Sequence, residues 1–255
     1  IIFKSNAKDG GVYIEGCDKL GGSILIENSN VKIDKLYLNN LAAPSLPLKQ
    51  LFGGLNIIDS KVIFKEVEIA NNNSEDGINF IDSFAKGNQI NSINNSSDAI
   101  DADNSVLDIN SVSCSNTGND CLDLAYSVAN IKNLVSKYAK DKAISVGERS
   151  VLNLGELNVE DSEIGLVGKD LSIINLTKYD FRNVKVPLVA FIKKGEFGSP
   201  SINILKAKNS LLSNSLISYD SNLFIRNKKV NGSYSSQEIG DKLYGIEYGI
   251  KTIRP

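Results

Sequence analysis

Residues 96–105, SSDAIDADNS, belong to a stretch that repeats along the chain and decides its fold. The segment SDAIDAD at 97–103 aligns with NDCLDLA at 119–125 and DKAISVG at 141–147, at a spacing of 22 residues. Further copies at this spacing are EDGINFI at 75–81, EIGLVGK at 163–169 and KVPLVAF at 185–191. One column is aliphatic throughout: Ile78, Ile100, Leu122, Ile144, Leu166 and Leu188. Such regularity predicts a repeat architecture in which equivalent residues stack.

Within each repeat, short β-prone segments alternate with polar turns. Val, Ile and Leu alternate with polar residues, while Asn, Ser, Asp and Gly cluster between the segments. Asn in such turns tolerates left-handed backbone and stacks its side-chain amides. Two more aliphatic columns follow the first: Val106, Val128, Val151 and Ile173, then Ile109, Ile131, Leu154 and Leu176.

A unit of 22 residues cannot bury its own apolar face and has to stack on copies of itself. We therefore predict an all-β, right-handed parallel β-helix of about nine or ten coils, about 4.8 Å apart, with every aliphatic column forming a ladder in the core. The leucine-rich repeat frame L-x-x-L-x-L-x-x-N is absent.

The coils are expected to form a single domain, 1–255, with the clearest repeats at 55–205. A segment near 41–54 contains Pro44 and Pro47 and breaks the frame, which predicts a loop or a short lateral helix. Residues 232–255 are expected to cap the open end of the core, with a short helix at DKLYG, 241–245.

Composition excludes several classes of function. The chain has 28 basic and 30 acidic residues, which argues against a nucleic-acid partner, and it has no His, which excludes Ser-His-Asp and Cys-His catalysis. Its apolar runs are too short to span a membrane.

The first residues, IIFKSNAKDGG, lack an initiator Met and a signal-peptide pattern, so we expect a processed or truncated chain. The three cysteines are expected to be small buried thiols, with a Cys114–Cys121 disulfide as the alternative.

The repeats from SDAIDADNSVLDINSVSCSNTGNDCLDLA onward resemble the bacterial right-handed parallel β-helix proteins, a pectate-lyase-like superfamily that includes polysaccharide lyases, polygalacturonases and phage tailspikes. The resemblance covers about residues 55–205 and concerns the fold. NDCLDL departs from the GDDC segment of polygalacturonases because Asn119 stands before Asp120, and their catalytic His is absent. Calcium-dependent lyases of this fold use clustered Asp with Lys or Arg as base, and this chain offers Lys142, Arg149 and Lys169 near its Asp columns.

Strand alternation divides the aspartates into two groups. Asp76, Asp98 and Asp120 precede the strand in three repeats, where they are expected to accept hydrogen bonds from turn amides. Asp101, Asp103 and Asp123 are expected to point to solvent on a flat outer face. There they form either a plain polar surface or a Ca²⁺ site. Lys142 follows Asp120 in its column and is expected either to pair with it or to act as a catalytic base.

Residues outside these columns give two further expectations. KKGEFG at 193–198 departs from the rhythm and predicts a loop, in which Lys193, Lys194 and Phe197 are candidates for contact with an acidic sugar polymer. Glu148 and Arg149 are expected to form a local ion pair.

Three functions remain open from the sequence. The first is an extracellular, cell-surface or periplasmic scaffold or recognition module, associated with a polysaccharide or a larger protein assembly. The second is a calcium-dependent polysaccharide lyase or related enzyme that uses Lys142 and the three outward aspartates. The third is a phage or fibre-like fragment that trimerises.

Overall fold

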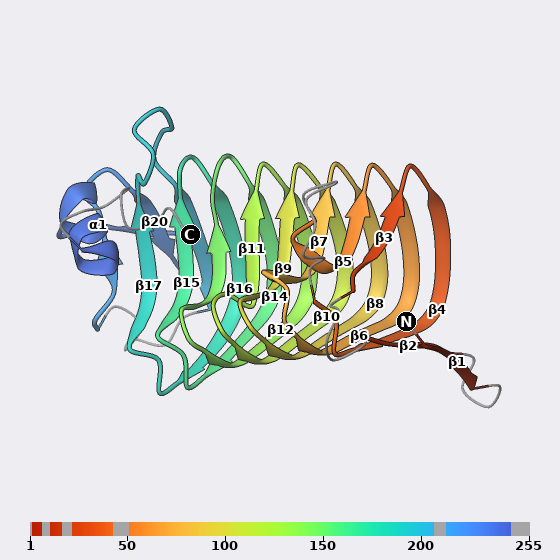
Figure 1. Cartoon of the computed structure of the whole chain (residues 1–255). Coiled ribbons are helices and arrows are strands. Elements are labelled where there is room, and N and C mark those ends of the chain that lie inside the picture. Colours follow the sequence, from red (N-terminus) through yellow and green to blue (C-terminus); the bar gives the residue numbers. More distant parts are fainter. Residues whose placement is uncertain (1, 7–10, 17–21, 43–50, 207–212, 246–255) are drawn as a thin grey trace.

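The computed structural model describes residues 2–6, 11–16, 22–42, 51–206 and 213–245. It is an all-β parallel solenoid of about nine turns with a repeat of about 22 residues, as the sequence predicts. The coils stack side by side along a rod (Figure 1). No helix within the described ranges is long and apolar enough to cross a membrane.

Two sheets make up the described part of the rod. The twelve-stranded sheet contains, in order, β1 (Ile2–Asn6), β2 (Gly11–Glu15), β4 (Asn30–Asn39), β6 (Lys61–Asn72), β8 (Phe84–Asn95), β10 (Val106–Thr117), β12 (Val128–Ala139), β14 (Val151–Glu160), β16 (Ile173–Arg182), β18 (Ser201–Lys206), β20 (Asn222–Ile225) and β21 (Lys228–Val230). The nine-stranded sheet contains β19 (Leu216–Ile217), β17 (Val186–Phe191), β15 (Ile164–Lys169), β13 (Lys142–Val146), β11 (Leu122–Ala125), β9 (Asp98–Asp103), β7 (Asp76–Ile81), β5 (Gly53–Ile58) and β3 (Ile24–Glu27).

The aliphatic column of the nine-stranded sheet forms the predicted ladder. Leu122 is in register with Ile100 on one side and Ile144 on the other, and all three are fully buried. Ile109 and Ile131 form a second buried ladder opposite them. Each coil therefore buries its apolar side chains against the coils above and below, which supplies the hydrophobic stabilisation that a single coil lacks.

One predicted core column lies outside the core. Val106 and Val128 are in register, but they are 39% and 37% exposed, and Ile173 is 43% exposed. The reason is alternation: Leu107 and Ile109 point inward, so the residue that starts the strand points outward. The prediction that this column packs in the core is wrong.

Two polar ladders hold the turns together. Asn94 and Asn116 adopt left-handed backbone, and their side-chain amides stack, Asn116 Nδ2 donating to Asn94 Oδ1 over 2.9 Å. At the other turn, the backbone N–H of Ser105 donates to Ser127 Oγ over 2.9 Å, and that of Ser127 donates to Ser150 Oγ over 3.0 Å. The serine bonds satisfy buried backbone N–H groups in coil after coil, whereas the asparagine bonds join exposed turns.

The cysteines and the C-terminal segment refine the sequence predictions. Cys114 and Cys121 form a disulfide inside the core, so the alternative to free thiols is the correct one. The predicted C-terminal helix is α1 (Ser236–Tyr244), which starts with a capping box between Ser235 and Glu238. Of the segment near 41–54 that breaks the repeat frame, residues 43–50, with Pro44 and Pro47, lie outside the described residues, as does Cys17.

The helix lies at one end of the rod, beside β17 (Figure 1). Its buried residue Ile239 packs against Val167, Val189 and Phe191, which point outward from β15 and β17. The helix therefore covers the outer face of the last coils at this end of the rod.

Candidate functional site

The candidate site is the outer face of the nine-stranded sheet between β7 and β17, where the aspartate columns lie. The column that starts the strands changes from acidic to basic to apolar along the rod: Asp76, Asp98, Asp120, Lys142, Ile164 and Val186. The next outward column also changes along the rod, from amide through carboxylate and hydroxyl to aliphatic: Asn79, Asp101, Asp123, Ser145, Val167 and Val189. The face thus has a direction that follows the stacking axis.

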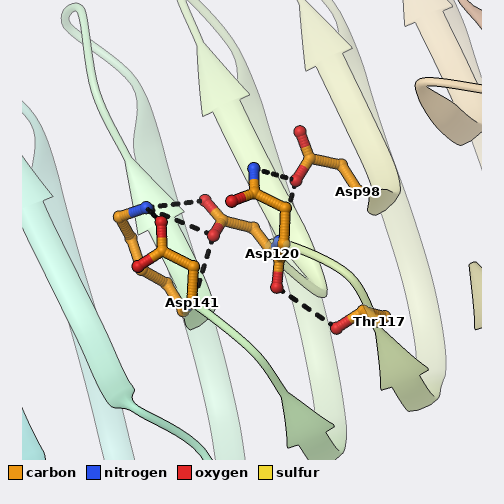
Figure 2. Close-up of polar contacts among 6 residues, drawn as sticks. Asp98, Thr117, Asp120 and Asp141 are labelled. Atoms are coloured by element: carbon orange, nitrogen blue, oxygen red, sulfur yellow. Dashed lines mark hydrogen bonds and ion pairs between the residues drawn. The ribbon is translucent and has the colours of Figure 1, made fainter. Parts of the chain in front are cut away.

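Two of the strand-start aspartates, Asp98 and Asp120, bind the backbone of the next coil, as predicted. Asp98 Oδ1 accepts hydrogen bonds from the backbone N–H of Asp120 over 2.8 Å and from Asn119 Nδ2 over 2.6 Å. Asp120 Oδ1 accepts from the backbone N–H of Lys142 over 3.0 Å. Figure 2 shows these carboxylates on successive coils, each aimed at the next. This column is structural because its carboxylates satisfy buried N–H groups.

Lys142 forms the ion pair that the sequence analysis expected. Its Nζ lies 3.2 Å from Asp120 Oδ1 and also contacts the carboxylate of Asp141. The side chains of Lys142 and Asp120 are only 7% and 1% exposed. Burial lowers the pKa of Lys142, but the carboxylates of Asp120 and Asp141 outweigh burial and raise it. A proton-abstracting base works best with a pKa near the operating pH, so this environment favours the ion-pair role.

The outward aspartates of β9 and β11 differ in protonation. Burial, together with the charges of Asp76, Asp123 and Asp103, raises the pKa of Asp101 to about 9. Burial also acts to raise the pKa of Asp123, but the ammonium groups of Lys169, Lys142 and Lys193 outweigh it and lower that pKa.

These two residues are partners in register on neighbouring strands. At neutral pH the face therefore places a neutral carboxylic acid beside a carboxylate.

The outer face is less open to solvent than alternation alone suggested. Asn79 and Ser145, which stand in the same column as the two aspartates, are 2% and 0% exposed. Asp101 and Asp123 are intermediate in exposure, and Asp103 is exposed. Although the Asp103 side chain is exposed overall, the partial burial of its carboxyl, followed by the nearby charges of Asp123 and Glu148, raises its pKa. The expectation of a fully solvated polar face is wrong for this part of the sheet.

The predicted calcium ligands do not converge as a metal site in the described part of the chain. No group of three or more carboxylate or thiol side chains among the described residues is arranged to hold a metal ion. Asp101 and Asp103 are two positions apart on β9, and Asp123 lies on β11 opposite Asp101. The metal-binding roles of these three residues stay a prediction.

KKGEFG forms the predicted loop, which follows β17. Asp170 Oδ1 accepts hydrogen bonds from the backbone N–H groups of Lys193 and Lys194, each over 2.7 Å. Lys193 Nζ lies 5.0 Å from the ring centroid of Tyr244 at the end of α1. Burial and the charges of Lys169 and Lys142 lower the pKa of Lys193 to about 8.

The loop also contacts the turn residues of earlier coils. Lys194 Nζ lies 2.6 Å from Glu148 Oε1, so Glu148 has a cross-coil partner, and the Glu148–Arg149 ion pair expected from the sequence is replaced. The Arg149 guanidinium lies 6.0 Å from the centroid of the Phe197 ring, which is 6.1 Å from that of Tyr126. The substrate-binding roles of Lys193, Lys194 and Phe197 stay a prediction.

Sequence reasoning named Lys169, which lies near Asp123, as a basic residue close to the Asp columns, but it missed two contributors to this face: Asp170 beneath the loop and Tyr244 from α1. Asp123 and the other nearby charges overcome burial and raise the pKa of Lys169, while burial raises that of Tyr244. Lys169 stands in an outward column of β15 and was detectable by alternation. Asp170 and Tyr244 reach the face through long-range packing, which no repeat pattern encodes.

Comparison of the chain with family models, with curated proteins and with solved structures finds no match. The chemistry of the site therefore rests on its geometry. It holds a buried lysine–aspartate pair, a neutral acid next to a carboxylate, and a loop with cationic and aromatic side chains.

Proposed function

We propose that this chain is an exported β-solenoid that serves as a scaffold or recognition module for an acidic polysaccharide. The observation that carries the proposal is the state of Lys142. The cation best placed to act as a lyase base is held between Asp120 and Asp141, with its pKa raised. An ammonium in that state contributes to the fold of the solenoid, and a rigid rod with polar faces is suited to binding an extended polymer.

Two observations support an exported protein that binds a polymer. The Cys114–Cys121 disulfide favours an oxidising compartment such as the periplasm or the cell exterior. Rows of exposed amides on the twelve-stranded sheet, in which Asn175 Nδ2 donates to Asn153 Oδ1 over 2.9 Å, offer hydrogen-bonding groups at the spacing of the coils. Membership of the bacterial pectate-lyase-like β-helix proteins is part of the same proposal.

Affinity electrophoresis combined with a product assay tests the proposal. The protein is run through gels that contain an acidic or a neutral polysaccharide, and the same polymers in solution are monitored for the ultraviolet absorbance of unsaturated uronates. We expect retardation in the acidic gels and no absorbance change, with or without about 1 mM Ca²⁺, a concentration typical of extracellular calcium sites. Equal mobility in all gels contradicts recognition, and product formation contradicts a purely binding role.

A carbohydrate-active enzyme is the second candidate, because Asp101 and Asp123 have pKa shifts of opposite sign. Neighbouring carboxyls with pKa values driven apart are the arrangement that acid–base catalysis uses. If polysaccharide cleavage is detected, Asp101→Asn and Asp123→Asn should each abolish it, whereas Asp59→Asn, in an exposed turn between β5 and β6, should leave it unchanged. Cleavage that survives both changes contradicts this assignment.

A further inference from the structure

A groove crosses the outer face of the twelve-stranded sheet over β4, β6, β8, β10 and β12, away from the candidate site. Its volume is about 690 Å³. It follows the line where the strands bend. At this line the strand pairing skips one residue in each successive coil: Asp34, Lys65, Asn88, Asn110 and Lys132. The groove therefore runs along the stacking axis of the rod.

A glycine shapes the floor of the groove. Gly87 stands between Phe64 and Ile109 in an inward column, and a Cβ at Gly87 would lie 2.0 Å from Phe64 Cε2. The Phe64 ring thus occupies the space that a side chain at this position would need. Ile33 and Ile63, both partly exposed, line the groove and form its apolar floor, while the Phe64 ring is only 4% exposed and packs in the core beneath it.

Two lysines of the groove have no counter-ion among the described residues. Lys65 Nζ lies 2.9 Å from Asp34 Oδ1, and Lys86 Nζ lies 2.7 Å from Asp108 Oδ2. Within each pair the two charges neutralise each other. Lys32 and Lys132 also line the groove and are exposed. Neither has an ion-pair partner among the residues that the structure describes. The groove therefore has an excess of positive charge in a chain whose net charge is −2.

The unpaired lysines lie on strands β4 and β12, at opposite ends of the groove. Four strand spacings separate these strands, which corresponds to about 19 Å along the axis. Between them, the exposed amide of Asn110 donates to Asn88 Oδ1 over 3.0 Å. The groove thus offers a cation at each end, amides in the middle and an apolar floor.

We propose that this groove binds a linear acidic polysaccharide whose chain lies along the rod axis. The inference rests on the proposed recognition function and names the surface that carries it. Lys32 and Lys132 bind two acidic groups of the polymer, Asn88 and Asn110 bind hydroxyl groups between them, and the apolar floor packs against the CH faces of the sugar rings. Nucleic acid suits the groove less well, because a duplex carries one charge per about 1.7 Å and requires a dense row of cations.

A charge-reversal experiment tests the groove. The double variant Lys32→Glu/Lys132→Glu is compared with Lys228→Glu/Lys229→Glu, which makes the same change in net charge on the exposed lysines of β21. Binding to polygalacturonate, to a neutral glucan and to single-stranded DNA is measured by affinity electrophoresis, and circular dichroism checks the fold. We expect the groove variant to bind polygalacturonate roughly ten-fold or more weakly and the β21 variant to bind it almost as well as the wild type.

The other outcomes overturn the inference in distinguishable ways. If the wild type binds polygalacturonate and both variants weaken it equally, the proposed function holds but the groove is not its site. If the wild type binds no acidic glycan, the proposed function fails together with the groove. If DNA is bound more tightly than polygalacturonate and only the groove variant loses it, the groove is real and the assigned polymer class is wrong.

Discussion

The two sheets of the rod share one core but hold charge on their outer sides in different ways. On the nine-stranded sheet, the Lys142–Asp120 pair is almost completely buried, with side chains 7% and 1% exposed. On the twelve-stranded sheet, the Lys86–Asp108 pair also joins residues of neighbouring coils, but its side chains are 60% and 44% exposed. The repeat therefore determines which residues form contacts across coils, whereas the burial of each contact determines how much it contributes to stability.

Replacing one carboxylate in each pair should give the largest contrast. Asp120→Ala leaves the buried Lys142 ammonium with only the Asp141 carboxylate beside it, and it removes the acceptor of the Lys142 backbone N–H. We therefore expect a loss of about 3–5 kcal/mol in the free energy of unfolding. Asp108→Ala removes an exposed pair, and we expect a loss of no more than about 1 kcal/mol. Urea unfolding monitored by circular dichroism measures both values. Similar losses in the two variants would show that burial does not separate the pairs.

A second contrast compares an inward with an outward aliphatic column. Leu122 is fully buried between Ile100 and Ile144, so Leu122→Ala should cost about 2–5 kcal/mol through lost burial and the cavity it leaves. Val106 is 39% exposed, so Val106→Ala should cost less than about 1 kcal/mol. Thermal and urea unfolding of both variants check the pair of values. A large loss for Val106→Ala would indicate that something covers this column.

The inner side of the solenoid could be predicted because two periods coincide there. The 22-residue spacing stacks Ile100, Leu122 and Ile144, and strand alternation turns them inward together with Ala102 and Leu124. The Asp98 and Asp120 backbone contacts followed from the same repeat. The stacked serines Ser105, Ser127 and Ser150 were also detectable as a column, although the sequence analysis did not use them.

The rest of the face depends on contacts between segments that no repeat relates. Asp170 binds the loop backbone at Lys193 and Lys194, Glu148 pairs with Lys194, and Tyr244 arrives from α1. Alternation correctly turned Asp101 and Asp123 outward, but it contains no information about what shields them. Exposure outside a solenoid depends on loops and helices, so the protonation of these carboxyls could not be derived from the sequence.

That difference in protonation yields a third contrast, which depends on pH. The pKa of Asp101 is raised to about 9 in the folded state, compared with about 3.9 in an unfolded chain. Between these values the folded protein holds a proton that the unfolded protein has lost, so Asp101 lowers stability as the pH rises. Asp101→Asn keeps the neutral form, and its stability relative to the wild type should increase from pH 5 to pH 9, by at most about 1.4 kcal/mol per pH unit.

Asp123 provides the matched control because its pKa is shifted in the opposite direction. A carboxyl with a lowered folded-state pKa stabilises the protein above its unfolded pKa and loses that contribution as the pH falls through its folded pKa. Asp123→Asn should therefore be less stable than the wild type at pH 7, and the deficit should shrink below about pH 4. Urea unfolding of the three proteins over this pH range measures both trends. If the two variants follow the same pH dependence, adjacent coils do not hold Asp101 and Asp123 in different protonation states, and the acid–carboxylate pair loses its basis.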